Sequence, residues 1–399
     1  MSHNPANRVQ DLQNFGEYGG VNPSIADSST FTYLKASTMQ AVFEGEKEGC
    51  HLYSRHTNPS TSYLSQALAR MENTEAAYVA SSGMGAITSC ILQICESGDE
   101  IIASRTIYGG SYAFLKNFLP KLGIKTHFID ITKTNQVEAL VNDNTKMVYC
   151  ETISNPLLEI ADIPALASIT KNTSIKLVVD NTFTPMIISP IELGADIVIH
   201  SLTKFINGAS DAVGGVVCAD GEFITSMLDV NNGAGMLLGP VMDPFRAASI
   251  LKNMRTLHIR MKQHSHNAKF ISEHFLKEGI KVYYPGIESH PQFSLMNKSY
   301  NKEFGYGGML VLDVKTKKNA YAFMEAMQND NIGYLAVSLG FYKTLFSAPG
   351  SSTSSEIPEE EQEQMGLSEG MVRISIGIDN DINRTFEKMK NCMKNVGIL

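Results

Sequence analysis

Residues 176–204 read KLVVDNTFTPMIISPIELGADIVIHSLTK, and they contain two apolar strands that each end near a residue able to do chemistry. The first strand ends at Asp180, and the second leads through His200 and Ser201 to Lys204. Strands of the same kind alternate with helical segments, at 76–80, 100–104, 125–130, 146–152, 176–180, 196–200 and 214–219. This alternation predicts an α/β fold with a mainly parallel central sheet covered by helices.

The flanking regions predict an arm and a second domain. Residues 1–60 are rich in Gly, Ser, Asn and Tyr with weak periodicity, which favours an arm that contacts a neighbouring subunit. Residues 61–242 then form the large domain, and residues 243–399 form a linker helix followed by a smaller α+β domain. In this last part we expect strands at 309–314, 335–338 and 371–376, helices at 319–328 and 383–394, and a solvated loop at 347–363.

The composition is that of an ordinary globular protein that acts on small molecules. Of 399 residues 43% are hydrophobic, and 41 acidic against 33 basic side chains are spread along the chain without the concentrated basic surface that nucleic acid or anionic lipid requires. Six cysteines show no metal-binding spacing, which indicates reduced thiols in the cytoplasm and no metal site. The polar N-terminus and the apolar runs, all short, predict neither an export signal nor a membrane span.

Lys204 follows an apolar strand that we expect to be buried, in the segment Ser201-Leu-Thr203-Lys204-Phe-Ile-Asn-Gly208. An ammonium in apolar surroundings is costly unless it is neutralised or given chemical work, and a bond to an aldehyde is one such use. The flanking hydroxyls of Ser201 and Thr203 are suited to holding a phosphate. A surface lysine in a turn is the alternative for this segment alone.

Asp180 would emerge at the same carboxyl edge of the sheet as Lys204, because ligands of doubly wound sheets bind there. An aspartate at this edge can pair with a pyridinium nitrogen and keep it protonated. A helix cap is the alternative role.

The segment Ser81-Ser82-Gly83-Met84-Gly85 stands between a strand and an apolar helical run, so its amides open onto a helix N-terminus that can bind phosphate. A tight turn of small residues is the alternative. The segment lacks both GxGxxG and the P-loop lysine, which disfavours a dinucleotide or a nucleoside triphosphate. A phosphate cradle, a lysine for an aldehyde and an anion for a ring nitrogen are together the requirements of pyridoxal 5′-phosphate (PLP).

Eight words carry a resemblance to a known family: Tyr53-Ser-Arg55-His-Thr-Asn58-Pro59, Ser82-Gly83-Met84, Tyr108-Gly109-Gly110, Glu151-Thr-Ile-Ser-Asn155-Pro156, Asp180-Asn-Thr, Ser201-Leu-Thr-Lys204, Ser338-Leu-Gly340 and Val372-Arg373-Ile-Ser375. Over essentially its whole length the chain resembles the cystathionine/methionine-metabolism (trans-sulfuration) family of fold-type I PLP enzymes. The resemblance implies an aspartate aminotransferase-like fold and a homo-oligomer, a tetramer made of two catalytic dimers.

The resemblance also implies a role for each matching residue. Lys204 forms the internal aldimine and later moves protons, Asp180 pairs with the pyridinium nitrogen, and Tyr108 stacks on the ring and takes part in catalysis. The phosphate is held by Ser82, Gly83, Met84, Ser201 and Thr203, and by Tyr53 and Arg55 from an adjacent subunit. The substrate is bound by Arg373, whose planar guanidinium suits a carboxylate, and by Asn155 and Ser338. In isolation, arginines such as Arg55 and Arg373 are more often surface ion-pair residues, and a tyrosine such as Tyr108 a core aromatic.

Two positions depart from the family pattern. Methionine γ-lyases of the family usually carry a cysteine where this chain has Gly110, and cystathionine γ-lyases and γ-synthases usually carry an acidic residue where it has Lys343. A cation at Lys343 would favour substrates with an anionic or ester-bearing distal end, whereas a solvent-facing Lys343 would have no part in selection. The substrate is therefore left open by the sequence.

Two reactions fit the same catalytic residues. The first is elimination by a carbon–sulfur lyase, which gives a thiol, ammonia and a 2-oxo acid from methionine, cystathionine or homocysteine. The second is γ-replacement on an activated homoserine, as in cystathionine γ-synthase or O-acetylhomoserine sulfhydrylase. A PLP-binding protein without catalytic activity is the third hypothesis, and Lys204, Tyr108 and Arg373 together argue against it.

Overall fold

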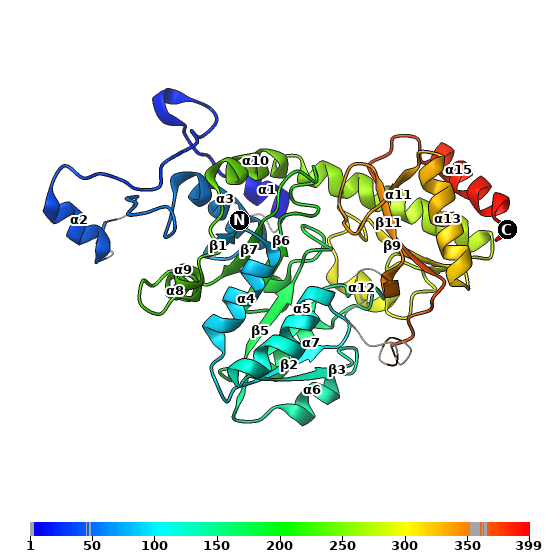
Figure 1. Ribbon diagram of the computed structural model, residues 1–399, viewed down its shortest axis with the longest axis horizontal. Coiled ribbons are helices and arrows are strands. Elements are labelled where there is room, and N and C mark those ends of the chain that lie inside the picture. Colours follow the sequence, from blue (N-terminus) through cyan, green and yellow to red (C-terminus); the bar gives the residue numbers. More distant parts are fainter. Residues whose placement is uncertain (1–3, 45, 48, 352–359, 361, 363–364) are drawn as a thin grey trace.

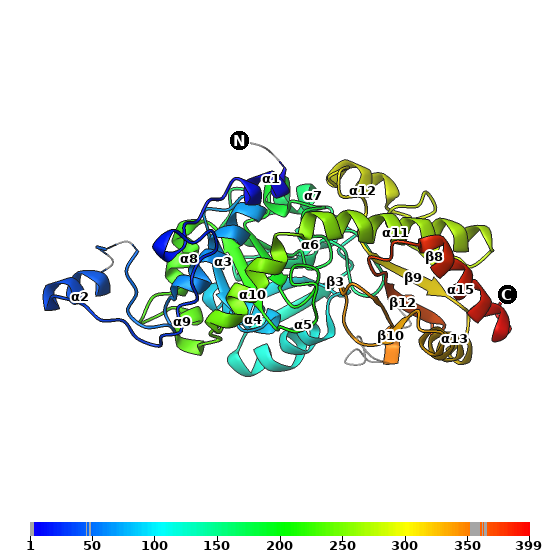
Figure 2. The same cartoon turned by 90° about the horizontal axis from the view of Figure 1, so that it is seen from above.

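The computed structural model describes residues 4–44, 46–47, 49–351, 360, 362 and 365–399. These residues form two β-sheets that lie one after the other along the longest axis of the molecule (Figure 1). Helix α11 (Leu257–Lys277) runs between them, and helix α2 (Ala36–Phe43) stands apart at the far end of the large body in both views (Figures 1 and 2).

The larger sheet has seven strands in the order β1-β7-β6-β5-β4-β2-β3. Strands β3, β2, β4, β5 and β6 are parallel, whereas β7 is antiparallel to both β6 and β1. The strands are β1 (Ala76–Ala80), β2 (Glu100–Ser104), β3 (Lys125–Ile129), β4 (Thr145–Glu151), β5 (Lys176–Asp180), β6 (Ile197–Ser201) and β7 (Gly215–Ala219). The predicted α/β fold with a mainly parallel sheet is confirmed, with every one of these strands where the sequence pattern places it to within one residue.

The register brings the chemically active strand ends to one level. Glu151 at the end of β4 is paired with Asp180 at the end of β5, and Asp180 is in turn paired with Ile199 of β6. Because successive side chains of a strand point to opposite faces, Val178 and Ile199 enter one core while Val179 and Val198 enter the other.

Helices cover both faces of this sheet (Figure 2). One face packs on α4 (Gly83–Ile94), α5 (Gly109–Ala113) and α8 (Gly221–Met227), with α9 (Ala234–Leu238) beside α4. The other packs on α3 (Pro59–Glu72), α6 (Thr134–Leu140), α7 (Ile163–Thr170) and α10 (Pro244–Met254). Short 3₁₀ or π turns occur at Glu17–Gly19, Phe114–Phe118, Leu119–Leu122, Pro190–Leu193 and Pro349–Ser351.

The smaller sheet has the order β10-β11-β12-β9-β8. Its strands are β8 (Lys281–Tyr283), β9 (Met309–Asp313), β10 (Gly333–Leu335), β11 (Thr344–Ser347) and β12 (Met371–Ser375). It shares a hydrophobic core with α11, α13 (Lys317–Asn329) and α15 (Ile382–Asn395), while α12 (Phe293–Ser299) contributes Met296 to the core of the large sheet.

One predicted strand in this region is wrong. The strand expected at 335–338 is instead β10, which ends at Leu335, and the chain then leaves the sheet. The reason lies at Gly340, which has a positive φ of 78° and packs against the backbone of Phe205, so residues 336–340 are drawn toward the turn that carries Lys204. The sequence pattern also misses β8 and β11, and β11 takes up Ser347, the start of the expected loop at 347–363; residues 352–359, 361 and 363 of that loop lie outside the described residues.

The N-terminal segment is anchored to the body at its start and exposed further on. Helix α1 (Pro5–Gln10) packs on α3, and Arg8 pairs with Glu192. Tyr18 and Leu34, which both lie between α1 and α2, are fully exposed. In the part of the chain that the structure describes, no helix has the length and apolar character needed to cross a bilayer. All six cysteines are free, and five of them are buried.

Candidate active site

A cavity of about 240 Å³ lies between the carboxyl ends of β4, β5 and β6 and the small-sheet region, which contributes Val337, Leu339 and Arg373 to its lining. Most of the residues predicted for the cofactor and the substrate line it, namely Ser82, Gly83, Met84, Tyr108, Asn155, Asp180, Ser201, Thr203, Lys204 and Arg373. These residues come from segments up to 291 positions apart in the sequence (Ser82 to Arg373). The fold therefore brings residues of motifs that are far apart in the sequence into one cavity.

Lys204 lies in the turn that follows β6, and its amine is directed at the small-sheet side of the cavity. Its Nζ donates a hydrogen bond to Ser338 Oγ at 3.1 Å. Burial lowers the pKa of Lys204 to about 8, with a further contribution from the positive charge of Arg373. With a pKa of about 8, roughly a tenth of the amine is neutral at pH 7, far more than for an ordinary lysine, and the neutral amine is the form that attacks a carbonyl.

Asp180 and Glu151 place two carboxyl groups side by side across the β4–β5 ladder. Burial raises the pKa of Asp180, while hydrogen bonds from the hydroxyl and the amide of Thr182 oppose that rise. Burial raises the pKa of Glu151 as well, and the neighbouring Asp180 adds to the effect, whereas Arg373 counteracts it. Like charges held this close favour a cation between or beside them.

The N-terminus of α4 forms the opposite wall. Ser82 caps the helix by accepting a hydrogen bond from the amide of Gly85 at 2.9 Å. Gly83 allows this end of the helix to touch β6, because a Cβ on Gly83 would lie 2.9 Å from Cβ of Ser201. The hydroxyls of Ser201 and Thr203 line the same part of the cavity. Free amides at the start of a 12-residue helix, with hydroxyls beside them, suit a phosphate.

Arg373 reaches the cavity from β12 of the small sheet, and its side chain is 3% exposed. Its Nη1 donates to Asn155 Oδ1 at 3.0 Å. Burial lowers the pKa of Arg373 to about 10, which still leaves the guanidinium charged at neutral pH. A buried arginine that faces an open cavity can receive a carboxylate in a bidentate arrangement.

Tyr53 and Arg55 are two predicted site residues that the fold does not bring to this cavity, whereas Ser338 does not line the cavity itself but contacts Lys204 there. Tyr53 is about half exposed, with the Arg55 guanidinium 6.0 Å from its ring centroid. Arg55 instead lines a separate polar hollow together with residues of α3 and β1. Their predicted place on another subunit's site is compatible with this exposed position.

The two positions that depart from the family pattern differ in their surroundings. A Cβ on Gly110 would lie 2.6 Å from Cε1 of Tyr108, so the ring of Tyr108 occupies space that any larger residue would take. Lys343 does not line the cavity, and its ammonium lies 4.9 Å from the ring centroid of Tyr334. The geometry gives Gly110 a direct effect on Tyr108, and it gives Lys343 a contact outside the cavity.

Sequence reasoning missed several residues that line the cavity. One of them is Glu151, which ends an apolar strand in the same way as Asp180. The signal that identified Asp180 could have identified it too. The wall of Ile153, Phe183, Val213, Val337 and Leu339 carries no such signal, because apolar residues are equally common in any core.

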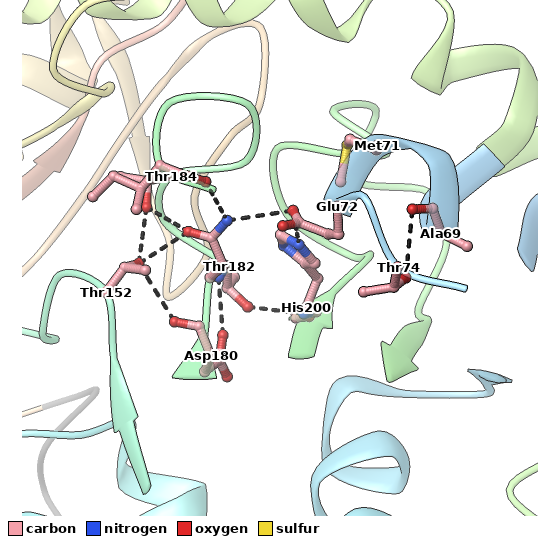
Figure 3. Close-up of polar contacts among 12 residues, drawn as sticks. Ala69, Met71, Glu72, Thr74, Thr152, Asp180, Thr182, Thr184 and His200 are labelled. Atoms are coloured by element: carbon pink, nitrogen blue, oxygen red, sulfur yellow. Dashed lines mark hydrogen bonds and ion pairs between the residues drawn. The ribbon is translucent and has the colours of Figure 1, made fainter. Parts of the chain in front are cut away.

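Beneath Asp180, on the opposite face of the sheet, lies a buried polar cluster (Figure 3). His200 Nε2 and Glu72 Oε1 are 2.7 Å apart, and neither side chain is accessible to solvent. Asn181 joins Glu72 at 3.4 Å and accepts hydrogen bonds from Thr152 and Thr184. This cluster ties the C-terminus of α3 to the ends of β4, β5 and β6.

We expect Glu72→Gln to lower the free energy of unfolding by about 1–3 kcal/mol, because the new amide group would be buried without the charge-assisted contact to His200. The measurement is the midpoint of thermal unfolding, which should fall by several degrees. Glu75→Gln is the matched control on an exposed side chain just beyond the same helix; its amide oxygen can still accept the hydrogen bond from the Gly221 amide, so the midpoint should change little. Equal midpoints for both variants would show that the buried contact contributes nothing.

The donor set of the cavity fits PLP on three observations of this structure. Lys204 is held in a state that forms a bond with an aldehyde, Asp180 offers a buried carboxyl group for a ring nitrogen, and the α4 N-terminus offers amides for a phosphate. The glycine at position 83 lets the start of α4 lie directly against Ser201, which brings the helix amides and the Ser201 hydroxyl together. Lys204, Asp180, Tyr108 and the phosphate-facing residues would therefore hold the cofactor.

Comparison with known proteins gives consistent matches over nearly the whole chain. The family model of Cys/Met metabolism PLP-dependent enzymes matches residues 7–392. A methionine γ-lyase of Arabidopsis thaliana is 44% identical over 94% of this chain and 86% of its own, and an L-methionine γ-lyase of Porphyromonas gingivalis is 39% identical over 91% and 90%. A solved structure from Campylobacter jejuni, described as an O-acetylhomoserine (thiol)-lyase with N′-pyridoxyl-lysine-5′-monophosphate, has 27% identity and a TM-score of 0.90 over 98% of this chain and 100% of its own.

Proposed function

Because the chain belongs to the Cys/Met metabolism family of PLP-dependent enzymes, we propose that it is a carbon–sulfur lyase that releases a thiol, ammonia and a 2-oxo acid from L-methionine. The observation that carries the proposal is the convergence of Lys204, Asp180 and Arg373 on one cavity. An amino-acid substrate needs an anchor for its carboxylate and a base near Cα, and this cavity provides both.

Each side chain then has a task that follows from its position. When bound, the cofactor supplies an electron sink for the charge left on Cα after a proton is removed. Lys204 would hold the cofactor covalently and move the proton, since its lowered pKa, about 8, allows it both to take up and to give up a proton near neutral pH. Asp180 would hold the ring nitrogen, and Tyr108 would lie against the ring.

The remaining residues bind and orient. Arg373 takes the substrate carboxylate, and Asn155 holds its guanidinium in place. Ser338 orients the Lys204 amine. Ser82, Gly83, Met84, Ser201 and Thr203 hold the phosphate. The buried apolar side chains of Ile153, Phe183 and Leu339 in the lining keep water from this part of the cavity and suit the uncharged side chain of methionine.

The alternative function is γ-replacement, which the similarity to a structure described as an O-acetylhomoserine (thiol)-lyase favours. The purified enzyme should be supplied with L-methionine, L-cystathionine, L-homocysteine and O-acetyl-L-homoserine, each with and without an added thiol. Release of 2-oxobutyrate from methionine without a thiol supports the lyase. If product forms only when O-acetylhomoserine and a thiol are both present, and that product is a thioether, the enzyme is a γ-replacement transferase and the lyase proposal is wrong.

We further propose an arm at residues 1–60, a large domain at 61–242, a linker and small domain at 243–399, and a homotetramer in the cytoplasm. The exposed arm and the distance of Tyr53 and Arg55 from their own cavity support the tetramer, and the free cysteines support a reducing compartment. In sedimentation velocity the active enzyme should run as a tetramer. A fully active monomer would contradict the role of Tyr53 and Arg55.

We expect Arg373→Lys to lower kcat/KM for L-methionine by roughly tenfold or more, because a bidentate charged contact is worth about 1.5–3 kcal/mol. The visible absorbance of the bound cofactor should stay the same, since Arg373 approaches from the small sheet. Lys343→Glu is the matched control, and it should leave the ratio of kcat/KM between methionine and cystathionine within about fivefold. Unchanged kinetics in Arg373→Lys would remove the carboxylate-binding role.

A further inference from the structure

Glu151 occupies the centre of the site, between two loops that carry functional residues. Its Oε1 accepts a hydrogen bond from the backbone amide of Tyr108 at 2.7 Å, and its Oε2 accepts one from the backbone amide of Asn155 at 2.9 Å. The first amide belongs to the loop after β2 and the second to the loop after β4. One carboxylate thus fixes the end of the first loop, just before α5, and the early part of the second.

Asn155 continues this connection to the other sheet. Its Oδ1 accepts a hydrogen bond from Arg373 Nη1 at 3.0 Å, and Asn155 and Arg373 are each 3% exposed. The path therefore runs from Tyr108 through Glu151 and Asn155 to Arg373. Every contact along it is a hydrogen bond to or from a buried group, and buried hydrogen bonds to charged groups are the stronger ones.

The chemistry of a carboxylate matters at this position. Two N–H donors approach the side chain of Glu151, one at each oxygen. A carboxylate accepts at both oxygens, whereas a glutamine amide accepts at one and presents N–H groups at the other. A side chain that only had to fill this space would not need to be acidic, and a carboxylate buried beside Asp180 is costly to keep.

We propose that Glu151 is a positioning residue that sets Tyr108 and Arg373 at a fixed separation, so that the carboxylate anchor and the ring-stacking side chain act on one substrate molecule together. The proposal rests on the proposed function, because it takes the roles of Tyr108 and Arg373 from there. Glu151 acts through these two residues and through Asn155. Its loss should affect both ends of the path.

The loop that carries Tyr108 offers a matched control. Thr106, two residues before Tyr108, donates a hydrogen bond to Glu159 at 2.6 Å, and Glu159 does not line the cavity. Thr106→Val therefore removes a carboxylate contact of the same loop without touching the path to Arg373. The variant under test is Glu151→Gln, with Glu151→Asp as the conservative variant that retains two acceptor oxygens.

The first measurement is amide hydrogen exchange of the apoenzyme, followed by mass spectrometry of peptides. Glu151→Gln should speed exchange in the peptide that contains Tyr108 and in the one that contains Asn155, and Glu151→Asp should do so less. Thr106→Val should leave the Asn155 peptide at the wild-type rate. If both peptides of Glu151→Gln exchange at the wild-type rate, the proposal is overturned. A wild-type enzyme that releases no 2-oxo acid would overturn the proposed function alone, because the exchange measurement does not depend on activity.

The second measurement is made on the holoenzyme. Glu151→Gln should lower kcat/KM for L-methionine by about tenfold to a hundredfold and weaken inhibition by hexanoate, a carboxylate without an amine that reports on Arg373. Thr106→Val should change both by less than about threefold. In a double-mutant cycle, Tyr108→Phe and Arg373→Lys should be non-additive in the wild type and additive in the Glu151→Gln background.

The outcomes divide cleanly. Loss of coupling together with weaker hexanoate binding supports the proposal. A change confined to the Tyr108 end, or coupling that survives Glu151→Gln, overturns it. If Glu151→Gln does not fold, Asn155→Ala tests the same path, since it should weaken hexanoate binding while leaving exchange in the Tyr108 peptide at the wild-type rate.

Discussion

Lys204→Ala is expected to abolish covalent attachment of PLP and to lower the rate of 2-oxo acid release by roughly 10³-fold or more. Lys204 supplies both the amine that holds the cofactor and the group that moves the proton at Cα, and a positioned proton-transfer group alone contributes about 10²–10⁴-fold. Its burial and its contact with Ser338 keep the amine in a reactive state. The measurement is borohydride reduction of the PLP-loaded protein, followed by identification of the labelled peptide and by steady-state kinetics.

The matched control for this experiment is Lys343→Ala. Lys343 contacts the ring of Tyr334 and does not line the cavity, so this variant should retain both the label and the activity. A label found on a lysine other than Lys204 in the wild type would refute the assignment. Retention of the label in Lys204→Ala would refute it as well, because the imine would then have to form on another lysine.

The sequence predicts the large sheet well, because both of its faces are buried and its strands are short apolar runs. The same pattern leads to Asp180 and Lys204, since a polar residue at the end of such a run stands out. Glu151 has this signature as well, since it is the last residue of a buried apolar strand, so the same pattern could have predicted it as a site residue.

Other parts of the site could not be predicted from local pattern. Arg373 lies on a separate sheet, and no spacing along the chain shows that it would meet Asn155, 218 positions away. The strand expected at 335–338 is wrong because the chain leaves the sheet after Leu335, where Gly340 packs on the backbone of Phe205. The contact of Ser338 with Lys204 is a product of that departure from the sheet.

The second large effect is expected for Asp180→Asn, which should lower kcat/KM for L-methionine by about 10²–10³-fold. Asparagine has the same shape and can still accept the hydrogen bond from the amide of Thr182, so the loop geometry should survive. What is lost is the charge that would face the protonated ring nitrogen, and removal of one partner of a buried ion pair costs about 3–5 kcal/mol. Each 1.36 kcal/mol corresponds to a factor of ten in rate.

The control for Asp180→Asn is Glu159→Gln. Glu159 is a partly buried carboxylate that does not line the cavity. This variant should leave kcat/KM within about threefold of the wild type. The visible absorbance adds a second reading, because a ring nitrogen without its anion should lose its proton more readily and shift the spectrum of the bound cofactor. Wild-type kinetics and spectrum in Asp180→Asn would mean that another group holds the ring nitrogen.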